Sequence, residues 1–265
     1  MAKIQNQLNR RLRLVITLAI LLQACGRPEP PKMRTLTIAA AADLKFALDE
    51  AIHQFKSENA GIDVQPIYGS SGNFYTQITN NAPFDVFMSA DMEYPRRLEK
   101  DGLAMDGSEF EYAVGRLVVW TRSDSPLDVQ RLGMQALLDP SIQKVSIANP
   151  EHAPYGRAAV SAMQTFRVYD NVKEKFVLGE NVTQALEFID TGAAQVGIVA
   201  MSLASAPAVK SRGKYFEIPV DSYPRMDQGG VILRRVRDRD AAEQFRLFVL
   251  SPACQTIFKQ FGFYR

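Results

Sequence analysis

Three short loops of small and polar residues stand where strand-like sequence gives way to helix-like sequence. They are AAAD at residues 40–43, GSSG at 69–72 and NPEHAPYG at 149–156. A helix that begins at such a loop exposes its first backbone N–H groups, which have no acceptor within the helix, at the positive end of its dipole. These groups can hold an anion without charged side chains. An ordinary N-cap explains any single loop more simply, but several loops together indicate one anion-binding cleft.

The sequence lacks the motifs of the common enzyme classes. It contains no Walker loop, no G-x-S-x-G elbow, no H-E-x-x-H and no C-x-x-C. Of its two histidines, His53 lies off the apolar face of a predicted helix and is expected at the surface, whereas His152 lies in the third loop, where function and simple packing both stay open. No metal ligands have a recognisable spacing. We therefore expect neither catalysis nor a cofactor.

Strand-like and helix-like segments alternate from Arg34 onward, which is typical of a parallel or mixed sheet flanked by helices. In the first helix the apolar residues recur at intervals of three and four, which marks one buried face. The predicted strands are 36–40, 63–68, 85–89, 117–121, 145–148, 195–200 and 231–233, and the predicted helices begin at Asp43 and Phe74 or span 156–166, 182–190 and 239–250. A doubly wound α/β fold is the leading class, and such sheets bind ligands at the carboxyl ends of their strands.

Length and composition are those of a globular protein. The 265 residues allow one large domain or two lobes of roughly 100 residues each, and two lobes are favoured. No interior stretch approaches the length of a membrane span. The net charge of +2 does not suggest a nucleic-acid surface.

The N-terminus carries the signature of a targeting segment. Four basic residues among the first thirteen precede the apolar run 14–22 and then Leu22-Gln23-Ala24-Cys25, which is the order of a secretory signal. The last four residues resemble a bacterial lipobox, although Gln23 departs from the small or apolar residue usual there. We expect removal of residues 1–24, lipid on Cys25 and a tether at 25–33. An ordinary signal peptide with a chance cysteine is the alternative.

Cys254 is the other cysteine of the chain, so lipid on Cys25 would leave it without a disulfide partner. Its surroundings have a helical pattern. We expect a buried thiol that packs as a small apolar side chain and is chemically inert.

Seven segments in order, between residues 36 and 263, match a known family. They are AAADL at 40–44, GSSG at 69–72, APFDVFMSAD at 82–91, PEHAPYG at 150–156, GENV at 179–182, QVGIV at 195–199, and SP at 251–252 with IFKQFGF at 257–263. As a set, they make the chain resemble the periplasmic molybdate-binding proteins of ABC uptake systems. The resemblance implies the two-lobed fold of type II periplasmic binding proteins, with a mixed sheet and flanking helices in each lobe and the ligand cleft between them. Lobe 1 would hold residues 34–114 plus 222–265, and lobe 2 residues 115–221.

The resemblance also implies which residues contact the ligand. They are Ala42, Asp43, Ser70, Ser71, Tyr155, Asn181 and Val182. Asp43 departs from the serine of many members, and Ala200 departs from a tyrosine of some. Because a carboxylate repels a dianion, we expect Asp43 to turn back and cap its own helix, and Tyr155 to supply the hydroxyl missing at Ala200. The donor-only shell that remains suits a fully deprotonated oxyanion.

The function implied by the resemblance is binding of molybdate or tungstate at the periplasmic side of the bacterial cell envelope. A lipid-anchored monomer would deliver the anion to an ABC transporter permease, with no cofactor and no nucleic-acid partner. Sulfate, phosphate, chromate or an organic anion stay open as ligands, because sequence gives no cavity radius. An envelope lipoprotein that senses a ligand without transport is a second alternative, and an enzyme on a related fold a third.

The lipobox interpretation predicts that Cys25→Ser blocks lipid attachment. The variant should be soluble in the periplasm or remain unprocessed, because the thiol that receives the lipid is gone. Metabolic labelling with palmitate measures this directly. Equal labelling of the wild type and the variant would contradict the interpretation.

Overall fold

The structure is a computed structural model that describes residues 33–264. The predicted signal segment, Cys25 and nearly all of the predicted tether lie outside the described residues. In the part that is described, none of the helices is both long and apolar enough to cross a membrane.

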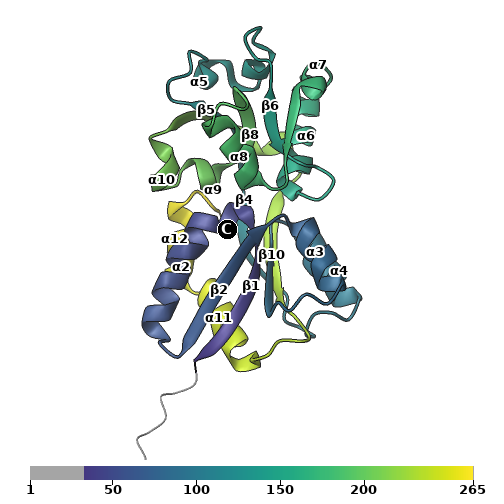
Figure 1. Ribbon diagram of the computed structural model, residues 1–265, viewed down its shortest axis with the longest axis vertical. Coiled ribbons are helices and arrows are strands. Elements are labelled where there is room, and N and C mark those ends of the chain that lie inside the picture. Colours follow the sequence, from purple (N-terminus) through teal and green to yellow (C-terminus); the bar gives the residue numbers. More distant parts are fainter. Residues whose placement is uncertain (1–32, 265) are drawn as a thin grey trace, which may run out of the picture. The chain divides into compact units, whose positions relative to one another are not determined.

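Lobe 1 is built on a five-stranded mixed sheet with the strand order β2-β1-β3-β10-β4 (Figure 1). Its strands are β1 (Arg34–Ala41), β2 (Ile62–Gly69), β3 (Val86–Ser89), β4 (Phe110–Gly115) and β10 (Met226–Ile232). Strand β1 runs parallel to both of its neighbours, β2 and β3. Strand β10 returns antiparallel between β3 and β4. The carboxyl ends of β1, β2 and β3 therefore lie at the same edge of the sheet.

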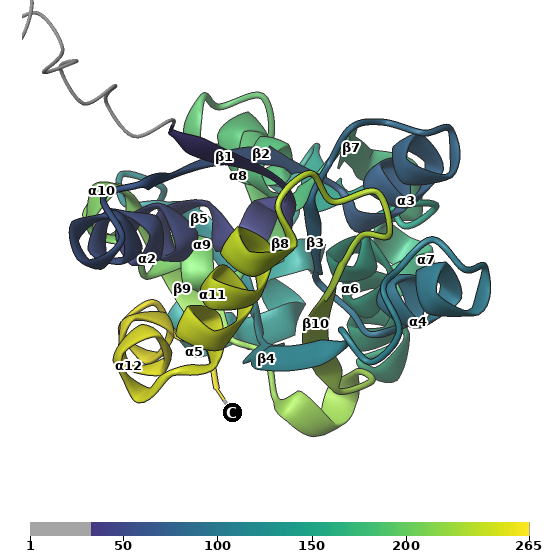
Figure 2. The same cartoon turned by 90° about the horizontal axis from the view of Figure 1, so that it is seen from below.

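Helices cover both faces of this sheet, as Figure 2 shows from below. They are η1 (Ala42–Leu44), α2 (Lys45–Glu58), α3 (Ser71–Thr79), α4 (Glu93–Lys100), α11 (Arg239–Leu250) and α12 (Pro252–Gln260). Helices α2, α11 and α12 share one core, in which Phe55 meets Phe245 edge to face with ring centroids 5.3 Å apart. Helices α3 and α4 form a second core on the other face, around Phe74 and Leu98. Each face of the sheet is thus buried by its own helices.

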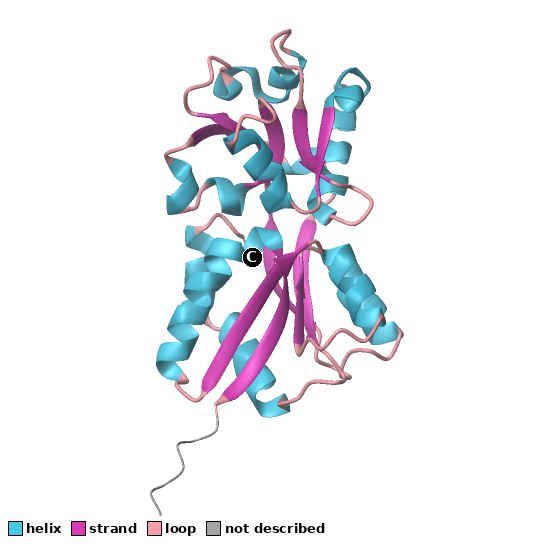
Figure 3. Ribbon diagram, in the orientation of Figure 1, coloured by secondary structure: helices cyan, strands magenta, loops and turns pink. Residues whose placement is uncertain are grey.

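Lobe 2 repeats this plan of a sheet flanked by helices (Figure 3). Its strand order is β7-β6-β8-β5-β9. Its strands are β5 (Leu117–Arg122), β6 (Val145–Ala148), β7 (Phe176–Gly179), β8 (Val196–Ala200) and β9 (Gly213–Glu217). Its helices are α5 (Val129–Leu132), η2 (Gly133–Leu138), α6 (Pro154–Thr165), α7 (Tyr169–Val172), η3 (Lys173–Lys175), α8 (Val182–Asp190), α9 (Met201–Ala204), α10 (Pro207–Lys210) and η4 (Val220–Ser222). Strand β6 is parallel to β7 and β8, and β5 is antiparallel to β8 and β9.

Two crossovers join the lobes. The first is the step from β4 to β5 at Arg116, and the second is the segment between β9 and β10. The Tyr223 hydroxyl in the second crossover accepts a hydrogen bond of 3.2 Å from the backbone N–H of Leu117 in β5. Arg116 pairs with Glu217, and its guanidinium lies 3.5 Å from the centre of the Tyr264 ring. The crossovers therefore support each other at the base of the cleft.

The predicted fold class is confirmed. Where the helices and strands of the structure differ from the predicted ones, the causes are local. Helix α3 begins at Ser71 rather than at Phe74, because the Ser70 side chain caps it by accepting from the N–H of Asn73. Strand β10 begins at Met226, five residues before its prediction, because Gln228 and the two glycines after it are buried in the sheet and do not form a turn. A Cβ on Gly230 would lie 2.5 Å from the carbonyl oxygen of Phe87. Strands β4, β7 and β9 were not predicted.

The predicted environments of Cys254 and His53 are confirmed. Cys254 is fully buried in helix α12 and forms no disulfide. His53 is exposed on helix α2.

Candidate functional site

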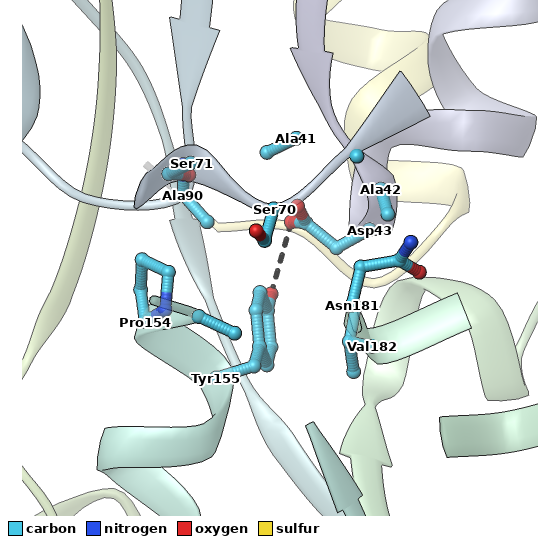
Figure 4. Close-up of a pocket in the computed structure, with 12 residues that line it drawn as sticks. Ala41, Ala42, Asp43, Ser70, Ser71, Ala90, Pro154, Tyr155, Asn181 and Val182 are labelled. Atoms are coloured by element: carbon cyan, nitrogen blue, oxygen red, sulfur yellow. Dashed lines mark hydrogen bonds between the residues drawn. The ribbon is translucent and has the colours of Figure 1, made fainter. Parts of the chain in front are cut away.

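A small cavity lies where the two lobes meet, at the carboxyl ends of strands from both sheets (Figure 4). Its lining residues are Ala41, Ala42, Asp43, Gly69, Ser70, Ser71, Ala90, Ala153, Pro154, Tyr155, Asn181 and Val182. The cavity measures about 200 Å³ with its open mouth included, which is below the range of sites for drug-sized ligands. All seven residues predicted from the sequence line it. Five further lining residues were not predicted from the sequence: Ala41, Gly69, Ala90, Ala153 and Pro154.

Three helices begin at this cavity: α3 at Ser71, α6 at Pro154 and α8 at Val182. The first N–H groups of each helix have no acceptor within the helix. Pro154 has no N–H of its own, so Tyr155 offers the first donor of α6. In α8 the Asn181 side chain accepts from the N–H groups of Thr183 and Gln184, at 3.0 and 3.1 Å, and leaves that of Val182 free for a ligand. The cavity is therefore a meeting point of positive helix ends.

Two serine hydroxyls add side-chain donors to the wall. Ser71 Oγ accepts a 3.0 Å hydrogen bond from the backbone N–H of Ala90, so its own proton is available for another acceptor. Ser70 Oγ accepts from the N–H of Asn73 at 3.4 Å as the cap of α3, which likewise leaves the hydroxyl proton. Both serines are buried. Among the described residues, no lysine or arginine lines the wall, so its positive potential comes from dipoles.

Asp43 brings the one ionisable carboxyl group into this wall, with only 1% of its surface exposed. Its Oδ2 accepts hydrogen bonds from Gln228 Nε2 at 2.8 Å and from the Tyr155 hydroxyl at 3.1 Å. Its Oδ1 is buried without a partner in the described residues. Burial away from water raises the pKa of Asp43 to about 6, although the hydrogen bonds from Gln228 and Tyr155 act to lower it.

Comparison with known proteins agrees with this geometry. Residues 36–264 match the family of bacterial extracellular solute-binding proteins. This chain belongs to that family.

Individual relatives within this family indicate which ligand similar proteins bind. The molybdate-binding protein ModA of Rhodobacter capsulatus is 40% identical over 78% of this chain and 79% of its own length. ModA of Azotobacter vinelandii is 34% identical over 95% and 96%. The solved periplasmic molybdate-binding protein of Azotobacter vinelandii superposes with a TM-score of 0.81 at 31% identity, and the match covers 87% of this chain and 99% of that one. Among solute-binding proteins, the chain thus groups with those named for molybdate.

Two side-chain predictions for this solute-binding protein are wrong. Asp43 does not cap its own helix, because the N-cap of η1 is Ala41 and makes no side-chain hydrogen bond; the carboxyl group instead meets Tyr155 and Gln228. Tyr155 does not replace a hydroxyl at position 200, because its proton is donated to Asp43. Ala200 is buried at the end of β8 and does not line the cavity. The cause of both errors is one contact between the lobes.

The lobes of this solute-binding protein are closed around the cavity by hydrogen bonds to the backbone of the first turn. Thr183 Oγ1 in lobe 2 donates to the carbonyl of Ala42 at 3.0 Å, and Ser202 Oγ donates to that of Asp43 at 2.8 Å. On the other side of the cavity, the N–H of Gly72 donates to the carbonyl of His152 at 2.9 Å. A Cβ on Gly72 would lie 2.7 Å from that same oxygen, so only glycine permits this approach.

An ion pair adds a further link between the lobes at the mouth of the cleft. Arg157 Nη2 of α6 lies 2.6 Å from Asp91 Oδ2 in lobe 1. Asp91 also accepts from the N–H of Tyr94 at 3.2 Å, which fixes its orientation. His152 serves mainly as structure here, since its carbonyl receives the Gly72 contact and its ring Nε2 lies 3.1 Å from the carbonyl oxygen of Glu180.

Sequence analysis missed Gln228, which is fully buried and holds both Asp43 and Tyr155. Its place in the same strand as the apolar Val231 and Ile232 is the signal that could have pointed to it. That signal was lost because the predicted strand began only at Val231. In the described residues no group of three or more histidine, cysteine, aspartate or glutamate side chains could hold a metal ion.

The burial of Asp43 predicts a pH-dependent gain in stability for Asp43→Asn in the ligand-free protein. Because the folded-state pKa is raised from 3.8 to about 6, the wild type loses stability as the pH rises through this interval. The variant has no such loss, so its advantage over the wild type should be larger at pH 7.5 than at pH 4 by about 2 to 3 kcal/mol, at roughly 1.4 kcal/mol per pKa unit. Urea unfolding at both pH values measures the difference. The same difference at both would contradict the burial argument.

Proposed function

We propose that this protein binds molybdate or tungstate in the periplasm and delivers the anion to the permease of an ABC transporter. The observation that carries the proposal is the cavity itself, in which the first N–H groups of three helices and two serine hydroxyls converge, with no lysine or arginine from residues 33–264 in its wall. The names and identities of the relatives support the choice of ligand.

The chemistry of the wall favours a small, compact anion that accepts hydrogen bonds on every side. A fully deprotonated tetrahedral oxyanion has only acceptors, and each hydrogen bond to a charged acceptor contributes roughly 1.5 to 3 kcal/mol. A protonated phosphate carries an O–H group, and this donor would face the donors of the wall and stay unpaired. Sulfate has the same charge and shape as molybdate, so its rejection depends on the radius at which Ser71, Tyr155 and Val182 present their donors.

The remaining parts of the proposal concern the cellular setting. We infer a periplasmic monomer that is anchored through lipid on Cys25, carries no cofactor and catalyses no reaction. A lipoprotein that senses the anion without feeding a transporter is the competing function. Uptake of labelled molybdate by a strain that lacks this protein separates the two, since only the transport function predicts lost uptake.

Selectivity is the first test of the proposed ligand. Isothermal titration calorimetry of the delipidated protein should show tight one-to-one binding of molybdate and tungstate, with far weaker binding of sulfate and phosphate. The reason is that the donors are set at one radius, which a smaller anion cannot contact on all sides. Equal affinity for sulfate and molybdate would contradict the assignment of the ligand while leaving the fold unaffected.

The donor set can be tested one hydrogen bond at a time. Ser71→Ala should weaken molybdate binding by about 1 to 3 kcal/mol, or roughly five- to 150-fold, because a buried charged acceptor loses one partner. Val182→Pro should have a comparable effect, since proline removes the N–H but is well accepted at the first position of a helix. The preceding Asn181 is already extended, with φ −152° and ψ 175°, as a residue before proline should be.

The matched control is Val182→Ala, which shortens the side chain but keeps the N–H. Its affinity should stay close to that of the wild type in the same titration. If Val182→Ala weakens binding as much as Val182→Pro does, the side chain and not the backbone donor is what the anion requires.

A further inference from the structure

One oxygen atom does not fit a wall made of donors. Asp43 Oδ1 is buried at the cavity and has no hydrogen-bond partner in the described residues. Figure 4 shows the carboxyl group of Asp43 turned toward the hydroxyl groups of Ser70 and Tyr155, within the ring of lining residues. An ionised carboxylate at this place would face any bound anion with a second negative charge.

The groups that pack around Asp43 offer no compensating cation. Gln228 from β10 and Tyr155 from α6 contact its Oδ2. Burial, and after it the Asp43 charge, raises the pKa of the Tyr112 hydroxyl in β4, so Tyr112 is neutral as well. Ser202 from α9 donates to the backbone carbonyl rather than to the carboxyl group. No ion pair in the described residues includes Asp43.

Cations on segments that adjoin the cleft are engaged elsewhere, and Arg116 is paired with Glu217. Arg157 is paired with Asp91 at the mouth of the cleft. Lys45, the first residue of α2, lies over the ring of Tyr68 at 5.2 Å from its centre. A dianion and an ionised Asp43 would therefore be buried together with only dipoles between them, at a cost of several kcal/mol.

Deepening the proposed function, on which this inference rests, we propose that Asp43 is a neutral carboxylic acid in the complex and donates the proton on its Oδ1 to the bound oxyanion. The proton comes from solvent and stays on the carboxyl group, so that one dianion and one proton bind together and no covalent bond changes. Asp43 thereby becomes a donor like the rest of the wall. Its Oδ2 keeps both hydrogen bonds from Gln228 and Tyr155, because a neutral carboxyl group still accepts at that oxygen.

This arrangement makes affinity depend on pH with a defined sign. Below the pKa of Asp43 in the free protein, about 6, the proton is already in place and affinity is at its maximum. Above that pH the proton must be taken up with the anion, so the dissociation constant should rise about tenfold per pH unit, reaching roughly a hundredfold at pH 8. The site is thus selective for the fully deprotonated form of the anion together with the protonated form of the protein.

Calorimetric titration with sodium molybdate between pH 6 and 8.5 tests the proposal. At pH 8, titrations in two buffers that differ in ionisation enthalpy should report one proton taken up per anion, and the dissociation constant should follow the tenfold slope. This count uses the wild type alone, so it does not depend on whether a variant folds. A flat profile with no proton uptake would overturn the proposal.

Two variants locate the proton. Asp43→Asn places an amide donor beside the anion at every pH, so its affinity should be independent of pH and, at pH 8, up to about a hundredfold tighter than that of the wild type. Asp91→Asn changes a partly exposed carboxyl group at the mouth of the cleft and should keep the wild-type slope. Loss of molybdate binding by folded Asp43→Asn would show that the carboxylate accepts a proton carried by the anion, which contradicts the proposal.

The outcomes also separate this inference from the function on which it rests. A wild type that binds molybdate at no pH contradicts the proposed ligand. A wild type that binds molybdate with equal affinity from pH 6 to 8.5 leaves the ligand standing and removes only the role of Asp43.

Discussion

Backbone N–H groups at the first turns of helices must find acceptors when they are buried. In this protein three helices, α3, α6 and α8, direct such groups into one cavity, and the closing of the two lobes shields them from water. An anion that accepts hydrogen bonds in all directions satisfies groups that the protein itself leaves open. The topology follows from the same need, because parallel strands bring their carboxyl ends, and hence the following helix starts, to one edge of each sheet.

Small residues make this closure possible. Alanines line much of the cavity, and Gly72 lets the start of α3 approach the carbonyl of His152 to hydrogen-bonding distance. Larger side chains would hold the lobes apart and admit water, which would weaken every dipole in the wall. The contacts of Thr183 and Ser202 with the first turn of lobe 1 then join the ligand wall and the lobe interface into one structure.

Asp43 is where the sequence and the tertiary structure conflict most openly. A carboxylate beside an anion contradicts local electrostatics, and a helix cap was the simplest local solution. The fold removes that solution by placing Tyr155 and Gln228, which are 112 and 185 residues away, against one carboxyl oxygen. The neighbours are all neutral, so burial raises the pKa of this carboxyl group. Under our proposal, this carboxyl group then joins the donors of the wall by holding a proton when the anion is bound.

The sequence by itself determined the alternation of strands and helices, the buried faces of the helices and the three loops at which helices begin. These depend on neighbours within a few residues, and for that reason helices 182–190 and 239–250 were predicted to the residue. Strand β10 and its Gln228 could not be found in this way, because polar residues and glycines are tolerated in a strand only when the opposite strand accommodates them. Tertiary structure alone decided which side chains meet across the cleft, since those contacts join residues that share no local pattern and become neighbours only when the lobes close.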